Sequence, residues 1–332
     1  MSRTFIKHIE SYLPQNLVSN HDVAGYAERG GYNLKGEMLS ALVGECNRYY
    51  ADADQQASDL AVNAARKILD KIPNENIDLL IFASACGDLI EPATANIVQH
   101  KLGLTCPAFD IKNACNSIAT AIEVGSCMMI GKGYNNVLIV SGEKPSDSIR
   151  FTDLTRNNIT NHIAAFTFGD AGVALLLEKT TDQDQGIFYQ RSKTFGQYWD
   201  LCRVLGGGSM FPRDASKLVF SGNTYELKKV IDKIAPPFVL GCLEEAKMSI
   251  KDIDFICSHQ VSKATAPGIN EHLKIGLNKI IQTFPLYGNT ASTSMPLALE
   301  YAMKQNQIQK GNIVMLLGMA AGINLSVQLM KV

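Results

Sequence analysis

A hidden repeat limits the folds that this chain can adopt. Three segments of the first half recur in the second half in the same order and at one offset of 176 residues: IDLL at 77–80 as IDFI at 253–256, DIKNAC at 110–115 as LYGNTA at 286–291, and NVLIV at 136–140 as NIVML at 312–316. Short apolar strands resemble one another by chance, but three ordered matches at one offset indicate a duplication. We therefore expect two similar halves, residues 1–178 and residues 179–332.

Helix-like and strand-like segments alternate within each half. Residues 59–69 have helical spacing, residues 78–83 and 137–140 are apolar and β-rich, and small residues fill 114–125 and 291–298. Continuous apolar strands between helices are typical of largely parallel sheets that are buried on both faces. We predict an α/β fold whose halves stack in five layers (αβαβα), with the two small-residue helices packed closely at the centre.

Composition and charge exclude several classes of function. With 31 Lys and Arg against 32 Asp and Glu, the chain lacks the basic surface that nucleic-acid binding requires. The first residues lack the apolar stretch of a signal peptide, and no run approaches the roughly 20 apolar residues of a membrane span. The eight cysteines include no CxxC pair and have no metal-ligand spacing with His or Asp. We expect a cytoplasmic globular protein with free thiols and no bound metal.

The duplication also predicts where a site would form. Ligands bind at the carboxyl ends of the strands in open α/β sheets. Cys115 opens the first central helix, Asn289 lies just ahead of the second, and His259 ends the strand that repeats residues 78–81. A helix N-terminus favours a thiolate, so this position would lower the pKa of the Cys115 thiol toward neutrality. Each residue alone has a structural explanation, but together they indicate nucleophilic thiol chemistry.

Six ordered motifs give the chain a resemblance to a known family. Residues 110–115, 258–261 and 287–292 match its nucleophile, His-Gln and Gly-Asn-Thr segments, and residues 168–172, 205–209 and 220–226 are supporting matches. Over nearly its whole length, the sequence therefore resembles the β-ketoacyl-acyl-carrier-protein synthase III (ketosynthase III) enzymes of the thiolase-fold superfamily.

This resemblance implies a thiolase-like fold, a homodimer and a condensation in two stages. Cys115 would take an acyl group from an acyl-CoA or acyl-carrier-protein thioester, with the backbone N–H groups of Cys115 and Gly322 as the oxyanion hole. His259 and Asn289 would then stabilise the enolate of a malonyl-type or β-ketoacyl thioester during a decarboxylative Claisen condensation. No cofactor is implied, because CoA or phosphopantetheine enters as part of the substrate.

Departures from the family pattern concern the substrate. Glu91 stands where the family often has an apolar residue that reaches into the acyl pocket of the partner subunit. Gly207 and Gly208 belong to a glycine-rich turn expected near the entrance, and Lys263 neighbours the position of a missing arginine. These four residues are candidate substrate contacts. The departures favour a specialised lipid or polyketide pathway over the standard initiation of fatty-acid synthesis.

Two alternatives stay open at the level of sequence. The acyl group could pass to oxygen or nitrogen, or two acyl chains could condense head to head. Asn289 favours C–C bond formation, because an amide cannot act as a base. The chain could also be a non-catalytic partner subunit of a heteromeric synthase, although such partners typically lose the nucleophile or the histidine.

Overall fold

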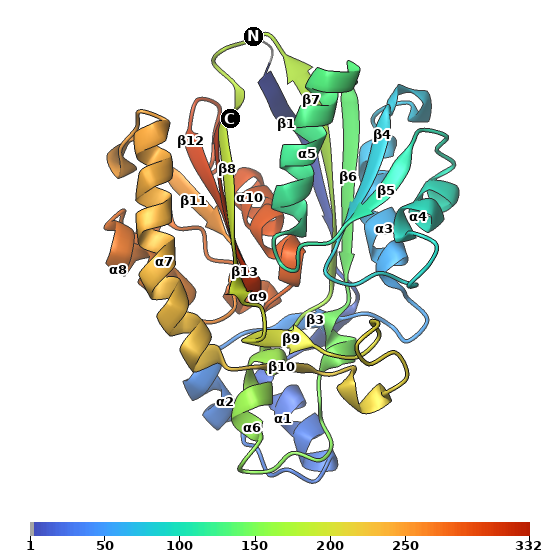
Figure 1. Cartoon of the computed structure of the whole chain (residues 1–332), viewed down its shortest axis with the longest axis vertical. Coiled ribbons are helices and arrows are strands. Elements are labelled where there is room, and N and C mark those ends of the chain that lie inside the picture. The colour runs from blue at the N-terminus through green and yellow to red at the C-terminus, as the bar shows by residue number, and fades with distance from the viewer. Residues whose placement is uncertain (1–2) are drawn as a thin grey trace.

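A computed structural model describes residues 3–332 and contains a nine-stranded mixed sheet between layers of helices (Figure 1). The strand order is β11-β12-β13-β8-β1-β7-β6-β4-β5. The first half supplies β1 (Arg3–Tyr12), β4 (Leu79–Ala83), β5 (Ala108–Ile111), β6 (Asn136–Glu143) and β7 (Ala171–Thr180). The second half supplies β8 (Gly186–Tyr198), β11 (Phe255–Ser258), β12 (Ile313–Ala320) and β13 (Gly322–Lys331).

The two halves repeat one arrangement of strands. β4 pairs in parallel with β6, and β11 pairs in parallel with β12. Ahead of β4, the Oδ2 atom of Asp78 accepts hydrogen bonds from the N–H groups of Asn135 (2.7 Å) and Asn136 (2.9 Å). Ahead of β11, Asp254 accepts one from the N–H group of Ile313 at 2.8 Å. The predicted boundary after residue 178 falls two residues before the end of β7.

The expectation of largely parallel strands is wrong. Only the pairs β4–β5, β4–β6 and β11–β12 are parallel. The pairs β6–β7, β1–β7, β1–β8, β8–β13 and β12–β13 are antiparallel. A continuous apolar run shows that a strand is buried on both faces, but the direction of the strand depends on the connection. β12 and β13 are joined by a tight turn at Ala321, which forces an antiparallel pair.

Three apolar clusters define the predicted five layers. Helices α3 (Ala57–Leu69) and α4 (Thr94–Leu102) cover one face of β4 and β6, and α7 (Thr224–Glu245) and α8 (Thr265–Leu273) cover β11–β13. Helices α5 (Ser117–Lys132) and α10 (Ser294–Lys304) lie between the two sets of strands, as Figure 1 shows. Strand β4 alternates accordingly: Leu79 and Ile81 face α5, whereas Leu80 and Phe82 face α3 and α4.

The central helix α5 is unusually apolar. Residues Ala114–Lys132 have a mean hydropathy of 1.2 and are long and apolar enough to cross a membrane by length and composition alone, against the expectation from the sequence. Half of this stretch is buried inside the protein. A Cβ atom at Gly125 would come within 3.2 Å of Leu177, so the helix packs closely on the sheet. A buried core helix has this composition too, and the expected cytoplasmic location stays a prediction.

Shorter elements gather at the lower end of the molecule in Figure 1, near the carboxyl ends of β4, β6 and β11. They are β2 (Asn16–Val18), α1 (Asn20–Arg29), α2 (Gly36–Val43), β3 (Arg48–Tyr50), α6 (Ile159–His162), β9 (Cys202–Val204), β10 (Phe220–Gly222) and α9 (Phe284–Tyr287). Phe151 and Phe166 stack in their apolar core with ring centroids 5.8 Å apart. This part of the molecule covers the edge at which the sequence predicts the site.

Candidate active site

Cys115 lies in a hydrogen-bonded turn between β5 and α5. The hydroxyl of Ser117 accepts from the N–H group of Asn113 at 2.8 Å and donates to the carbonyl of Ala114 at 2.7 Å. Ala114 has a φ of 49°, a left-handed conformation that an alanine adopts only where its surroundings impose it. The neighbouring Asn116 is the N-cap of α5. The turn therefore presents Cys115 at the start of the central helix, as predicted.

Asn289 occupies a matching turn ahead of α10. Its N–H group donates to the carbonyl of Thr167 at 2.7 Å, and its own carbonyl accepts from Gly169 at 3.0 Å. The side-chain oxygen of Asn289 accepts from the N–H group of Ala291 at 3.0 Å. Ala291, like Ala114, has a φ of 49°. Because its oxygen is engaged, the amide of Asn289 has its nitrogen available as a hydrogen-bond donor.

His259 directly follows β11 and is 5% exposed. Its backbone N–H group donates to the carbonyl of Leu317 at 3.2 Å. The backbone N–H group of the next residue, Gln260, donates to the hydroxyl of Ser294 at 3.0 Å. Burial lowers the pKa of His259 to about 4, although the adjacent backbone of Ala291 acts in the opposite direction. The imidazole is therefore neutral at neutral pH. It suits the role of a hydrogen-bond donor better than that of a stored positive charge.

The contacts bring these residues together from both halves. His259 and Asn289 meet at the backbone of Ala291. Cys115 lies within electrostatic reach of Glu143, which hydrogen-bonds the residue after Ala291. Burial, followed by Glu143 and Cys202, raises the pKa of the Cys115 thiol to about 12. The expectation of a thiol pKa near neutrality is therefore wrong, because desolvation outweighs the effect of the helix N-terminus.

Glu143 is a component of the site that the sequence analysis missed. It ends β6, is fully buried, and accepts hydrogen bonds from the N–H group of Ala85 at 2.8 Å and the hydroxyl of Ser292 at 2.5 Å. A signal was present in the sequence. An acidic residue three positions after the apolar run 137–140, at the end of the same strand, lies at the same edge of the sheet as His259 does after its strand.

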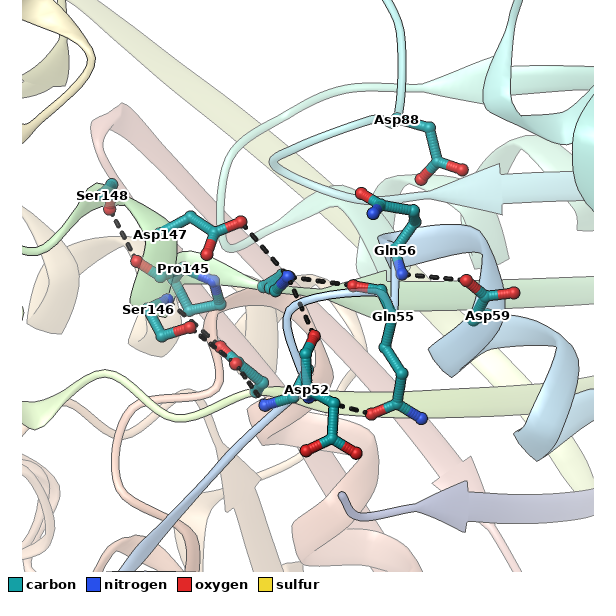
Figure 2. Close-up of polar contacts among 12 residues, drawn as sticks. Asp52, Gln55, Gln56, Asp59, Asp88, Pro145, Ser146, Asp147 and Ser148 are labelled. Carbon is teal, nitrogen blue, oxygen red and sulfur yellow. Dashed lines mark hydrogen bonds and ion pairs between the residues drawn. The ribbon is translucent and has the colours of Figure 1, made fainter. Parts of the chain in front are cut away.

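A polar network fixes the segment that follows Glu143 (Figure 2). The ammonium group of Lys144 donates to the carbonyls of Gln55 at 2.9 Å and Asp52 at 3.3 Å. Ser146 donates to the carboxylate of Asp170 through its hydroxyl at 2.6 Å and its N–H group at 3.1 Å. Burial raises the pKa of Asp170 to about 6. The end of β6 is therefore tied to the segment that precedes α3.

Within the described residues, no hydrogen bond joins the other predicted contacts to this cluster. Glu91 is exposed. Gly207, with a φ of 84°, forms a tight turn in which its N–H group donates to the carbonyl of Phe211 at 3.2 Å, and Gly208 is exposed beside it. The ammonium group of Lys263 donates to the carbonyl of Ala41, in the last turn of α2, at 2.6 Å. Their roles in substrate binding stay predictions.

Gly322 opens β13 and pairs with Tyr198 of β8. That the backbone N–H group of Gly322 forms part of the oxyanion hole stays a prediction. All eight cysteines are free thiols, as expected, and Cys127 is exposed. Within residues 3–332, no group of three or more His, Cys, Asp or Glu side chains is arranged to hold a metal ion. The absence of a cofactor from the reaction also stays a prediction.

Comparisons with known proteins identify the family. The model of 3-oxoacyl-[acyl-carrier-protein] synthase III matches residues 109–196, and that of its C-terminal part matches residues 243–332. The β-ketoacyl-[acyl-carrier-protein] synthases III of Neisseria meningitidis and Neisseria gonorrhoeae are 31% identical to the chain over an alignment of 323 residues, and the match covers 94% of this chain and 94% of each relative.

Solved structures share the fold. Xanthomonas campestris OleA with bound lauric acid and lauroyl-CoA has a TM-score of 0.88 at 24% identity, and the match covers 99% of each chain. A 3-oxoacyl-(acyl-carrier-protein) synthase III has a TM-score of 0.89 at 22% identity, covering 99% of this chain and 100% of the other. With the fold, the paired turns around Cys115 and Asn289 and the sequence relatives in agreement, the chain belongs to the β-ketoacyl-acyl-carrier-protein synthase III family of thiolase-fold condensing enzymes.

Proposed function

We propose that the protein catalyses a decarboxylative Claisen condensation through an acyl-enzyme at Cys115. The observation that carries this proposal is the pair of neutral hydrogen-bond donors at Ala291. The amide nitrogen of Asn289 donates no hydrogen bond within the described residues, whereas its oxygen accepts one. Burial keeps the imidazole of His259 uncharged. Negative charge develops on the thioester oxygen only in the transition state. Neutral donors therefore stabilise the transition state more than the uncharged ground state, which accelerates the reaction.

In the first stage, the sulfur of Cys115 attacks the carbonyl carbon of an acyl-CoA or acyl-carrier-protein thioester. A new S–C bond forms, the bond to the carrier sulfur breaks, and the proton of Cys115 passes to the leaving thiolate. The high pKa of the Cys115 thiol means that the resting nucleophile is protonated. This proton therefore has to leave as the S–C bond forms. The N–H groups of Cys115 and Gly322 would hold the oxyanion of the tetrahedral intermediate.

In the second stage, the extender thioester loses CO₂ and its electrons enter an enolate. The donors of His259 and Asn289 hold the enolate oxygen. The enolate carbon attacks the acyl group on Cys115, a C–C bond forms, and the S–C bond to the enzyme breaks. Removal of one such donor typically slows a reaction by about 10²–10³-fold. We expect the extender to be a malonyl-type thioester of a specialised lipid or polyketide pathway, because a β-ketoacyl thioester has no carboxylate to lose as CO₂.

A head-to-head condensation of two acyl chains is the second candidate. An acyl thioester without a carboxylate to lose needs a base that removes a proton from its α-carbon. Glu91 is the carboxylate that the family resemblance directs toward the acyl pocket of a partner subunit, and it is exposed in the single chain. The shared fold with OleA, whose structure holds lauric acid and lauroyl-CoA, makes two long acyl chains a reasonable substrate pair.

We also propose that the enzyme is a homodimer. β5 is an edge strand with one unpaired side. The first half of the chain also exposes large apolar side chains at Leu89 (55%), Ile90 (89%) and Ile130 (72%). An unpaired sheet edge can pair with another chain, and a contiguous exposed apolar patch often marks a protein interface. A second copy in this position would also bring Glu91 close to the neighbouring subunit.

Intact-protein mass spectrometry tests the first stage. The wild type and a Cys115→Ala variant are incubated with acyl-CoAs of different length and charge, and then with acylated carrier protein. We expect a covalent acyl adduct on the wild type only. A wild type that forms no adduct with any donor would refute the proposed nucleophile and favour a non-catalytic partner subunit.

Product analysis tests the second stage. Acylated enzyme is mixed with a malonyl thioester or with a second acyl thioester, and CO₂ and the product mass are measured. Decarboxylative condensation releases CO₂ and extends the chain by two carbons, whereas head-to-head condensation joins both chains without releasing CO₂. We expect the His259→Ala and Asn289→Ala variants to be acylated normally and to lose condensation. Transfer of the acyl group to an alcohol or amine would contradict the proposal.

A further inference from the structure

The carboxyl group of Glu143 lies behind the candidate catalytic residues, and the mechanism above does not use it. Its side chain has no accessible surface. Within the described residues, the groups that hydrogen-bond it are all uncharged and belong to Ser84, Ala85, Cys86 and Ser292. An acidic side chain buried without a cation costs free energy. Such a residue beside a reactive centre is a candidate for a functional role.

The hydrogen bonds of Glu143 connect the two halves of the chain. Its Oε1 atom accepts from the N–H group of Ala85 at 2.8 Å, and from the hydroxyl and N–H groups of Ser292 at 2.5 and 3.4 Å. Its Oε2 atom lies 3.5 Å from the sulfur of Cys86. Ala85 and Cys86 follow β4 of the first half, whereas Ser292 belongs to the 3₁₀ turn Ala291–Thr293 of the second half.

Ser292 links Glu143 to the groups that would hold the enolate. The preceding residue, Ala291, donates its N–H group to the side-chain oxygen of Asn289 at 3.0 Å. The backbone of Ala291 also lies against the imidazole of His259. A displacement of Ser292 would therefore move both donors. It would leave the turn that carries Cys115, which is held by Ser117, in place.

Glu143 also has an electrostatic effect on the nucleophile. Burial is the largest cause of the raised pKa of the Cys115 thiol, and the charge of Glu143 is the second. Burial raises the pKa of Glu143 itself to about 7, so its charge changes near neutral pH. The titratable groups that face it are the thiols of Cys86 and Cys115. The pKa of each is raised well above neutrality, so neither changes charge in this range.

We propose that Glu143 is a positioning residue of the condensation step: through Ser292 it holds the turn at Ala291 so that Asn289 and His259 face the enolate oxygen. This inference rests on the proposed function. It assigns the positioning role of Glu143 to C–C bond formation. Toward the acylation of Cys115, Glu143 contributes only the charge that raises the pKa of the thiol. The ionised carboxylate is the stronger acceptor, so condensation increases as the pH rises through about 7.

The test compares the wild type with Glu143→Gln, Ser292→Ala and Ser141→Ala. Glutamine keeps the shape of the side chain and an acceptor oxygen but has no charge. Ser141→Ala is the matched control, because it removes the 3.1 Å hydrogen bond between the Ser141 and Ser292 hydroxyls but leaves the bonds from Ser292 to Glu143 in place. Acylation by an acyl-CoA and condensation by the preformed acyl-enzyme are measured separately between pH 6 and 8.

We expect Glu143→Gln to be acylated within about threefold of the wild-type rate and to condense about tenfold more slowly, a change of about 1.4 kcal/mol in the barrier. Its condensation rate should no longer rise with pH. Ser292→Ala should show the same separation of the two steps, and Ser141→Ala should resemble the wild type. Ser292→Ala alone still tests the inference if Glu143→Gln does not fold. Normal condensation by Glu143→Gln, or an equal loss of both steps, would overturn it.

A measurement without substrate separates this inference from the proposed function. Iodoacetamide alkylation of Cys115 is followed against pH by peptide mass spectrometry, with the exposed Cys127 as the internal reference. In Glu143→Gln, the Cys115 profile should shift to lower pH while the Cys127 profile stays unchanged. A wild type that reacts with no thioester would refute the proposed function alone. An unshifted Cys115 profile would refute the placement of Glu143 beside the nucleophile.

Discussion

The close approach of α3 to β6 at Gly142 yields a prediction that can be worked out from distances. A Cβ atom at Gly142 would lie 1.7 Å from the carbonyl oxygen of Ala57, in the first turn of α3. Real Cβ atoms stay at least 3.0 Å from such atoms. In a Gly142→Ala variant, the helix and the strand would therefore have to separate by about 1.3 Å. The neighbouring Gly172 of β7 allows a similar approach to the carbonyl of Leu60.

This separation sets the size of the expected effect. Overpacking of a core typically costs about 1–3 kcal/mol, and a backbone carbonyl cannot rotate away as a side chain can. We therefore expect a loss of about 3 kcal/mol in the free energy of unfolding. With an unfolding entropy of about 2.1 cal/mol/K per residue, the 332-residue chain gains about 0.7 kcal/mol/K on unfolding. The Tm of Gly142→Ala should therefore fall by about 4 °C.

Differential scanning calorimetry measures this change, with Gly241→Ala as the control. Gly241 lies within α7, and a Cβ atom there would meet nothing within 4 Å. Alanine favours a helix over glycine by about 1 kcal/mol, so this variant should melt slightly above the wild type. A Gly142→Ala variant that melts within 1 °C of the wild type would refute the contact and the reasoning built on it.

Three further predictions concern pH, assembly and the repeated aspartates. The pKa of Asp170 is about 6 in the folded protein, against an ordinary value of 3.8, so the folded state binds more protons between these values. The free energy of unfolding therefore falls as the pH rises from about 4 to 6. In an Asp170→Asn variant, calorimetry should show a Tm that depends less on pH over this range, and an unchanged slope would contradict the prediction. Ile90→Asp should convert the proposed dimer to a monomer in analytical ultracentrifugation, whereas an unchanged mass would exclude this surface. Asp78→Ala should lower the denaturation midpoint more than Asp254→Ala, because it leaves two backbone N–H groups unpaired rather than one; equal midpoints would argue against it.

Much of the fold could be predicted because the sequence features that mark strands and helices occur in both halves of the chain. The same short sequence marks the start of a strand at residues 77–80 and 253–256, and Asp78 and Asp254 have matching roles there. Helix positions followed from the spacing of apolar residues. The directions of β7 and β13 could not be predicted, because they depend on where the chain turns back and not on how apolar the strand is.

The candidate site could be predicted in part for the same reason. Cys115, His259 and Asn289 each follow a strand or precede a helix, so the duplication places them at one edge of the sheet. Glu143 follows a strand as well, but an acidic side chain there can face solvent or the interior. Ser292, far away in the sequence, makes the interior position favourable through its hydrogen bond.

The sequence by itself determined the duplicated α/β architecture, the two small-residue helices and the position of Cys115, His259 and Asn289 at one edge of the sheet. These features depend on periodicity, residue size and chain order, which are local properties. Only the tertiary structure decided the ionisation of the site. The start of a helix would favour a thiolate at Cys115, yet burial and the charge of Glu143 raise the pKa of its thiol to about 12. Desolvation is the sum of many neighbours brought from distant parts of the chain, so no single segment carries it.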